Sequence, residues 1–350
     1  MGQLIPLTPA ELDELSDQFA WALSTRETPV IVPGEAILGI EAIAAGVAAR
    51  GRTILNIVTG PYGEQFGDWL SRGGSHVVEL RTPYDDVVAV AAVAEAIERH
   101  HPCAVAFVQG EAVTGGSNPT QALLDLARQN NLITIVDAVS AIGAEPVLMD
   151  EWAMDFVAVG AQKALSGSNG ISAVGISARG WEFLSRNASA PRHSALSLLD
   201  LKRASGEAEP VPANIPVLEA RAVIKAFHQI QTEGIASVNH RHQLAAASTL
   251  AGIKSLGLKA WQRQESACSP LVTTVRLRQG EPIIRQSRGI LAPGDGELYG
   301  KLLRVNHFGS QASLKSVEKA IGTLAGLLNA AQPEVAIHAV RKVWLASNDS

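Results

Sequence analysis

Two residues have the clearest chemical potential: an aspartate and a lysine that each stand at the end of an apolar run. Asp137 ends Leu-Ile-Thr-Ile-Val-Asp, and Lys163 follows Phe-Val-Ala-Val-Gly-Ala-Gln. A lysine amine can form an imine with an aldehyde, and a carboxylate can keep a pyridine nitrogen protonated so that the ring draws electrons from a substrate α-carbon. The pair therefore predicts a ring of the pyridoxal type, bound as an imine of Lys163.

The elements that must position this pair are short β-branched runs alternating with alanine-rich helical patterns. Such alternation predicts an α/β fold, with a mostly parallel sheet covered by helices on both faces. Sites in these sheets gather at the carboxyl ends of strands, where Asp137 and Lys163 would lie. The predicted strands are residues 30–32, 53–58, 76–80, 104–108, 132–136, 156–159 and 171–176.

The carboxy-terminal third has a different pattern. Residues 206–216 predict an irregular connection, and two helices follow at 217–232 and 235–255, separated by Gly234. Strand-like residues 271–277 and 301–305 and a final helix at 314–329 predict a small α+β domain. We therefore expect a large cofactor-binding domain over residues 1–235 and a small carboxy-terminal domain over 236–350.

Composition excludes several classes of protein. The chain has 350 residues, 47% of them hydrophobic, a formal charge of -5 and a pI near 6.0, without blocks of like charge. We expect no nucleic-acid partner and no membrane partner, and we expect a cytoplasmic location, because no signal sequence or membrane span is recognisable. Cys103 and Cys268 lack ligand spacing, and His240 and His242 predict a solvated helix face, so no metal site is expected.

Several further segments occur in the order typical of one family. They resemble the class V group of fold-type I pyridoxal-phosphate enzymes, typified by alanine-glyoxylate and serine-glyoxylate aminotransferases. Within the group the chain is most similar to the pyridoxamine-pyruvate aminotransferases, which treat the unphosphorylated ring as a substrate. The segments that match the group are residues 34–41, 60–63, 109–115 with 118–119, 137–140, 160–163 and 303–309, and those that match the subgroup are 29–42, 62–69, 83–84, 190–194 and 269–276.

The resemblance assigns roles to individual residues. It implies that Lys163 forms the imine and then shuttles a proton, and that Asp137 pairs with the ring nitrogen. Tyr62 would stack on the ring face, and Arg304 would clamp the substrate α-carboxylate. Gln162 would touch the hydroxymethyl group or the ring oxygen.

Glu35 departs from the phosphate-binding relatives. Those relatives place small or hydroxyl residues before this helix, so that its free amides hold the phosphate. A carboxylate at this point repels a phosphate but accepts a hydrogen bond from an uncharged 5'-hydroxyl. The sequence of Glu35 and Ala36 therefore predicts that pyridoxal or pyridoxamine is the favoured ring, with pyridoxal 5'-phosphate as the alternative.

Other departures concern the ring oxygen and the substrate. Ala112 replaces a family hydroxyl near the phenolic oxygen, and Thr114 is the candidate to replace it. Asp295 stands where the subgroup shows a second arginine, which leaves the amino donor and acceptor open. At residues 212–214 a tyrosine that reaches the partner's phosphate is absent. Relatives also have a longer amino-terminal arm, so we expect part of the pocket to be missing or built differently.

The resemblance implies an aminotransferase of the pyridoxamine-pyruvate type, which moves an amino group between the ring and a small amino acid or 2-oxo acid. Two alternatives remain. One is a phosphate-dependent alanine or serine-glyoxylate aminotransferase, or a lyase. The other is a non-catalytic relative that binds a vitamin B6 form. Because the family's sites are shared between subunits, we expect a homodimer or homotetramer.

Overall fold

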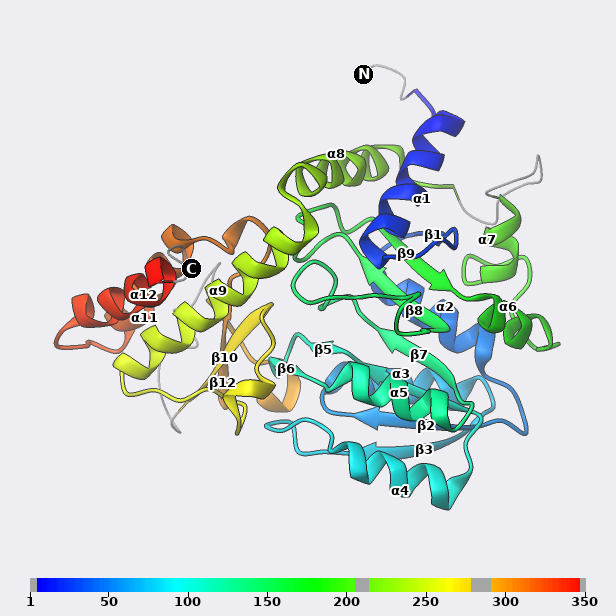
Figure 1. Ribbon diagram of the computed structural model, residues 1–350, viewed down its shortest axis with the longest axis horizontal. Coiled ribbons are helices and arrows are strands. Elements are labelled where there is room, and N and C mark those ends of the chain that lie inside the picture. Colours follow the sequence, from blue (N-terminus) through cyan, green and yellow to red (C-terminus); the bar gives the residue numbers. More distant parts are fainter. Residues whose placement is uncertain (1–4, 205–213, 278–290, 347–350) are drawn as a thin grey trace.

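The structure, a computed structural model, describes residues 5–204, 214–277 and 291–346 (Figure 1). Its centre is a seven-stranded sheet with the order β1-β9-β8-β7-β4-β2-β3. Strands β8, β7, β4, β2 and β3 run parallel, whereas β9 is antiparallel to β8 and β1 is antiparallel to β9. The strands are β1 (Val30–Pro33), β2 (Thr53–Val58), β3 (His76–Arg81), β4 (Ala104–Val108), β7 (Ile133–Asp137), β8 (Phe156–Gly160) and β9 (Ile171–Ile176).

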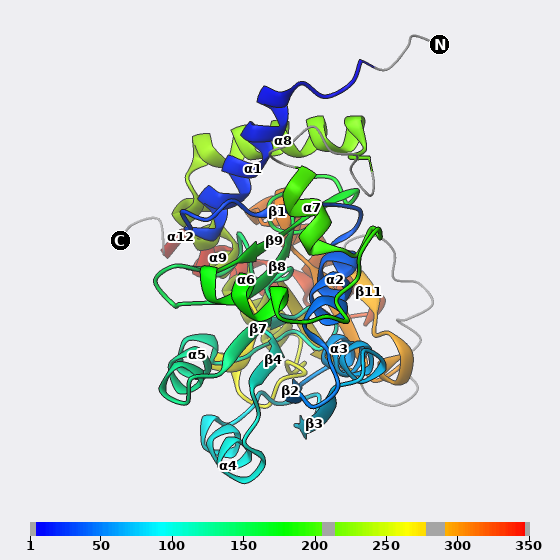
Figure 2. The same ribbon diagram turned by 90° about the vertical axis from the view of Figure 1, so that its right-hand side faces the viewer.

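Helices cover both faces of this sheet, as Figure 2 shows. One hydrophobic cluster joins the sheet to α1 (Pro9–Leu23), α4 (Val90–His100), α5 (Thr120–Gln129) and α8 (Val217–Glu233). A second cluster joins it to α2 (Ala36–Val47), α3 (Pro61–Arg72), α6 (Ala178–Ser185) and α7 (Leu198–Ala204). The central strands β4, β7 and β8 are buried along their whole length, because helices cover both faces.

The carboxy-terminal part has a hydrophobic cluster of its own. It packs α9 (Ile235–Ser255), α11 (Leu314–Leu327) and α12 (Pro333–Ala346) against an antiparallel sheet of order β10-β12-β11. Those strands are β10 (Val272–Arg276), β11 (Leu291–Pro293) and β12 (Leu302–Asn306). In Figure 1 these elements lie beside the seven-stranded sheet rather than over either of its faces.

Small elements complete the chain. The short strands β5 (Gly110–Glu111) and β6 (Gly116–Ser117) form a hairpin directly after β4. Three single turns of 3-10 helix follow later, η1 (Glu265–Ala267), η2 (Gly296–Leu298) and η3 (Gly309–Gln311). The β5–β6 hairpin and η2 both bear on the site described below.

The α/β class, the seven predicted strands and the helices at 217–232 and 235–255 are confirmed. The helix predicted at 314–329 is confirmed as α11, but it is not the final helix, because α12 follows it and packs on α9. Most of the predicted connection at 206–216 lies outside the described residues, and the boundary at residue 235 stays a prediction. No helix in the described part of the chain is long and apolar enough to cross a bilayer.

Candidate active site

Asp137 and Lys163 lie at the carboxyl ends of neighbouring parallel strands. Asp137 is the last residue of β7, paired in register with Ala158 of β8, and Lys163 follows three residues after β8 ends at Gly160. The Lys163 amine donates a hydrogen bond to Ser140 Oγ at 2.7 Å, and Asp137 Oδ1 accepts one from the Val139 N–H at 2.9 Å. The two side chains are thus brought to one edge of the sheet, and each is held by the loop that follows β7.

Burial sets the protonation of both groups. Loss of hydration lowers the pKa of Lys163, while the charges of Asp137, Glu111 and Glu35 oppose that shift. Burial raises the pKa of Asp137 to about 6, against the stabilising effects of Lys163 and the Val139 N–H. The lysine therefore yields its proton more readily than a surface lysine, and the aspartate keeps its charge at neutral pH.

Glu35 holds the amino terminus of α2. It is the N-cap residue, its Oε2 accepts from the Ile37 N–H at 2.8 Å, and its Oε1 accepts from Gln162 Nε2 at 2.6 Å. Ala36 follows as the first helical residue and is buried. The carboxylate therefore occupies the end of the helix that would otherwise offer free amides to an anion. The bond to Gln162 ties it to the loop that contains Lys163.

Tyr62 approaches Lys163 from the start of α3, and Thr114 lies between β5 and β6. The Lys163 amine lies 5.6 Å from the centre of the Tyr62 ring, at the start of α3. Thr114 is fully buried, and its hydroxyl has no hydrogen-bond partner within the described chain. Gln162 Oε1 is likewise buried without a partner. Unpaired buried polar atoms are costly, and one of these two, Gln162 Oε1, belongs to the residue directly before Lys163.

Arg304 lies on β12 of the carboxy-terminal part and still acts on the lysine. Its positive charge lowers the pKa of Lys163 further, and only 19% of its side chain is exposed. Its Nε donates to the Pro293 carbonyl at 3.2 Å, and its Nη2 lies 3.1 Å from Asp295 Oδ2. The acid that the sequence marked as a departure is therefore the partner of the predicted clamp.

Glu111 is the residue that the sequence interpretation missed. It lies on β5, is 1% exposed, and neither of its carboxyl oxygens has a hydrogen bond of good geometry. Burial and the nearby Asp137 raise its pKa to about 8, against the effects of Lys163 and of the Val113 and Gly63 amides. The only signals in the sequence are its place in the Gly-Glu-Ala-Val-Thr-Gly segment and the small residue that it packs against, Gly60.

The expectation of a solvated helix face at His240 and His242 needs correction. His240 is exposed, but His242 is buried, so the pair does not form a solvated helix face. His242 Nδ1 bonds the Val238 carbonyl at 2.7 Å, its Nε2 accepts from the Gly309 N–H at 3.0 Å, and burial lowers its pKa to about 4. Gly309 in turn lies against the Lys163 carbonyl, where a Cβ would approach to 2.8 Å.

Three further expectations concern a missing hydroxyl, a missing tyrosine and metals. Ala112 packs in a small apolar cluster beside Ala164 and Phe308. Residues 212 and 213 lie outside the described part. Among the residues that the structure describes, no group of three or more His, Cys, Asp or Glu is arranged to hold a metal ion.

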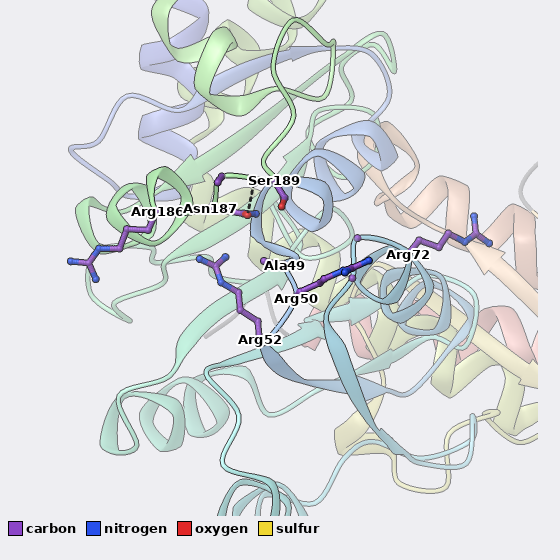
Figure 3. Close-up of a pocket in the computed structure, with 10 residues that line it drawn as sticks. Ala49, Arg50, Arg52, Arg72, Arg186, Asn187 and Ser189 are labelled. Carbon is purple, nitrogen blue, oxygen red and sulfur yellow. Dashed lines mark hydrogen bonds between the residues drawn. The ribbon is translucent and has the colours of Figure 1, made fainter.

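A pocket of about 510 Å³ lies away from these residues (Figure 3). It is lined by Arg50, Arg52, Arg72 and Arg186, near the amino-terminal starts of β2 and β3. Arg52 donates to the Val47 and Phe183 carbonyls, Arg72 pairs with Asp68 and Arg186 pairs with Glu182. Figure 3 shows Arg72 and Arg186 pointing in opposite directions. Arg52 links the end of α2 to α6, and the other two pairs each join residues four apart in the chain, so we assign the pocket no chemistry.

The residues around Lys163 fit a pyridoxal-type ring. They offer a buried amine, a buried carboxylate, an aromatic face and unpaired polar atoms in Thr114 and Gln162. A lysine and an aspartate at adjacent strand ends of such a sheet define the class: a fold-type I enzyme that works with a pyridoxal-type ring.

The chain belongs to the class V aminotransferase family, and it is a transaminase of that family. The family model "Aminotransferase class-V" matches residues 65–291. A pyridoxamine-pyruvate transaminase of Mesorhizobium japonicum is 32% identical over 93% of this chain and 85% of its own length. The crystal structure of the pyridoxamine-pyruvate aminotransferase of Mesorhizobium loti matches with a TM-score of 0.91 and 30% identity over 98% of this chain and 92% of that one. An alanine-glyoxylate aminotransferase structure from Nostoc matches with a TM-score of 0.86 and 26% identity over 93% and 90%.

Proposed function

We propose that the chain moves an amino group between an unphosphorylated vitamin B6 ring, pyridoxamine or pyridoxal, and a small amino acid or 2-oxo acid. The observation on which this rests is the position of Glu35. Its carboxylate caps the amino terminus of α2 by accepting a hydrogen bond from the Ile37 N–H. It also accepts one from Gln162, in the loop that leads to Lys163. The Mesorhizobium relative, a pyridoxamine-pyruvate transaminase, supports the same pair of substrates.

Electrostatics at the Glu35 position supports a preference for the ring without a phosphate. Two unit charges about 4 Å apart repel by roughly 4 kcal/mol at an effective dielectric near 20, and a phosphate has about 1.5 to 2 charges. A hydroxyl that donates to a carboxylate gains about 1.5 to 3 kcal/mol instead. Because Glu35 already accepts the hydrogen bond of the Ile37 N–H, the amino terminus of α2 has one fewer free donor for an anion. Both effects favour the ring that ends in a hydroxymethyl group.

Lys163 acts as the nucleophile and afterwards as the carrier of the proton. Burial lowers its pKa, so a larger share of the amine is neutral than on a surface lysine. Ser140 Oγ accepts a hydrogen bond from the amine at 2.7 Å and so holds the amine in one direction. The ring, when bound, serves as an electron sink for the bond that is broken at the substrate α-carbon.

The remaining residues hold and orient. Asp137 stays charged at neutral pH and would keep the pyridine nitrogen protonated. Tyr62 would cover one face of the ring, and Thr114 Oγ1 and Gln162 Oε1, unpaired and buried, would satisfy its oxygens. Ala36 offers a small buried side chain beside Glu35, so the hydroxymethyl group can approach. Arg304 would bind the substrate α-carboxylate, since its planar fork suits that group.

The test measures binding of pyridoxal and pyridoxal 5'-phosphate by their visible absorbance, in wild type and in Glu35→Gln, Glu35→Ser and Lys163→Ala. We expect wild type to bind pyridoxal more tightly by at least tenfold, about 1.4 kcal/mol. Both Glu35 variants should shift the ratio toward the phosphorylated ring. Glu41→Gln, which removes an acid from the same helix, is the matched control and should leave the ratio unchanged.

Different outcomes favour different alternatives. Binding of the phosphorylated ring alone contradicts the proposal and favours an alanine or serine-glyoxylate type enzyme, or a lyase. Binding that depends on Lys163, without conversion by alanine, pyruvate or glyoxylate, favours a relative that binds the ring without turnover. A homodimer or homotetramer is part of the proposal, and light scattering of the purified protein measures it.

A further inference from the structure

Asp295 and Arg304 form an ion pair on the hairpin of β11 and β12. Arg304 lies on β12 opposite Ala292 of β11, and Asp295 follows β11 by two residues. Arg304 Nη2 lies 3.1 Å from Asp295 Oδ2, and 60% of the Asp295 side chain is exposed against 19% for Arg304. The arginine is therefore the deeper member of the pair, and the acid faces the solvent side.

The backbone fixes the position of Asp295. A Cβ on the preceding Gly294 would lie 2.5 Å from the Leu298 carbonyl, and the following Gly296 has a φ of 55°. The Asp295 carbonyl accepts from the Leu298 N–H at 3.0 Å, which closes the turn of η2. The two glycines make this tight turn possible, so the acid is held beside Arg304 by the chain itself.

The charges of Arg304 and Asp295 both influence groups of the site. The Arg304 charge lowers the pKa of Lys163, and the Asp295 charge contributes to the raised pKa of Tyr62. Lys163 and Tyr62 lie 5.6 Å apart, amine to ring centre. A substrate bound at Lys163 and Arg304 would therefore lie close enough to Asp295 to respond to its charge.

The donors of Arg304 are already partly used. A guanidinium has five N–H donors, and here Nε serves the Pro293 carbonyl while Nη2 faces Asp295. A carboxylate normally takes two donors from one edge. A simple monocarboxylate would thus compete with Asp295 for the fork and place two negative charges side by side. A substrate with its own cation would bring no such penalty.

We propose that Asp295 selects amino acids that carry a second, side-chain ammonium group, together with the matching 2-oxo acids. The α-carboxylate would bind Arg304 and the side-chain ammonium would bind Asp295. The inference rests on the proposed function. The exchange balances without an outside oxidant: the α-amino group passes to the ring aldehyde carbon, the substrate α-carbon gains the keto oxygen, and one water is released and one consumed.

The experiment compares kcat/KM for alanine with that for 2,4-diaminobutyrate, ornithine and lysine, using pyridoxal as the acceptor. We expect the best diamino acid to exceed alanine at least tenfold in wild type. Asp295→Asn should reduce that preference by at least tenfold. Glu297→Gln, which removes an exposed acid from the same turn, should leave the preference unchanged.

A second measurement separates the inference from the proposed function. Calorimetry of the same amino acids on Lys163→Ala and on Lys163→Ala/Asp295→Asn measures recognition without exchange. Equal affinity for alanine and the diamino acids in both variants overturns the role of Asp295, as does a kcat/KM ratio that Asp295→Asn does not move. Retained binding preference with no exchange in wild type overturns the proposed function alone. A purely structural ion pair would lower the melting temperature of Asp295→Asn and leave both preferences as they were.

Discussion

Two glutamates close to Lys163 have opposite surroundings. Glu35 is half-buried, receives hydrogen bonds from Ile37 and Gln162, and caps a helix. Glu111 is fully buried, has no hydrogen bond of good geometry, and has a pKa raised to about 8. The first has both carboxyl oxygens in hydrogen bonds, and the second, with its raised pKa, holds its proton at neutral pH. The chain thus places a hydrogen-bonded carboxyl group at the start of α2 and a neutral acid against Gly60.

Both glutamates act on the same amine, so removal of Lys163 has the largest effect. Lys163→Ala should lower amine exchange by roughly 10²- to 10⁴-fold, the range that a positioned proton carrier supplies. Single-turnover conversion of pyridoxal to pyridoxamine measures it. Lys254→Ala, at an exposed lysine paired with Glu265, is the control. Exchange at the wild-type rate in Lys163→Ala would assign the amine chemistry to another residue.

Gly60→Ala tests the packing of Glu111, the fully buried glutamate of the two. A Cβ at Gly60 would lie 2.2 Å from Glu111 Cγ and 2.4 Å from its Cδ. Such overpacking costs about 1 to 3 kcal/mol, and it should also displace Tyr62, two residues away. Urea unfolding measures the loss, and Glu111→Ala in the same chain should restore part of it. Gly326→Ala, where a Cβ has open space, should cost nothing. No rescue in the double variant would mean that Glu111 does not fill this space.

Glu111→Gln tests the protonation itself. Because the pKa is raised from 4.5 to about 8 in the folded state, the folded chain binds more protons than the unfolded chain between these values. Stability therefore falls as pH rises through this window, by up to about 1.4 kcal/mol for each pH unit. Glu111→Gln should gain about 2 kcal/mol relative to wild type between pH 6.5 and 8.

The range from pH 6.5 to 8 lies above the pKa of Asp137, about 6, and above the pKa of His242, about 4. Unfolding free energies of both proteins at several pH values give the slope. Parallel curves for the variant and wild type would show that Glu111 is already ionised at pH 6.5.

Glu35→Ala should have the smallest effect on stability, about 1 kcal/mol, as for other N-cap residues. Its effect on ring choice should be much larger than this loss. Ser177→Ala removes the cap of α6, which accepts from the Gly180 N–H at 3.0 Å away from the site. We expect similar denaturation midpoints for the two variants and a changed preference between pyridoxal and its phosphate only for Glu35→Ala. A changed preference in both would trace ring choice to general loosening.

The comparison also separates what the sequence predicts from what it does not. Runs of apolar residues predicted the strands, and the polar residues that end them placed Asp137 and Lys163 on one edge. Glu35 was recognisable from the sequence because a carboxylate directly before a helix interacts with the free amides of that helix's first turn. Glu111 was not, because its raised pKa comes from desolvation, which depends on contacts with Gly60 and Asp137 across three loops.

Strand direction and side-chain partners were also beyond the sequence. The sequence of Val30–Pro33 predicts a buried strand but not its direction. Only its pairing with β9 shows that β1 runs antiparallel to that strand. The Asp295 substitution was visible, but its pairing with Arg304 depends on the hairpin between β11 and β12. His242 looked solvated because the donor to its Nε2, the Gly309 N–H, belongs to a distant segment.

Because of Gly309, assembly of the site depends on the order in which the chain is synthesised. This glycine lies against the Lys163 carbonyl and bonds His242 through its N–H, yet it emerges from the ribosome long after the sheet that holds Lys163. A nascent chain that ends before β12 would contain Lys163 but would lack the segment that packs against its loop, so the site would be incomplete. Reactivity toward aldehydes should therefore appear late in translation, when the growing chain is nearly full length.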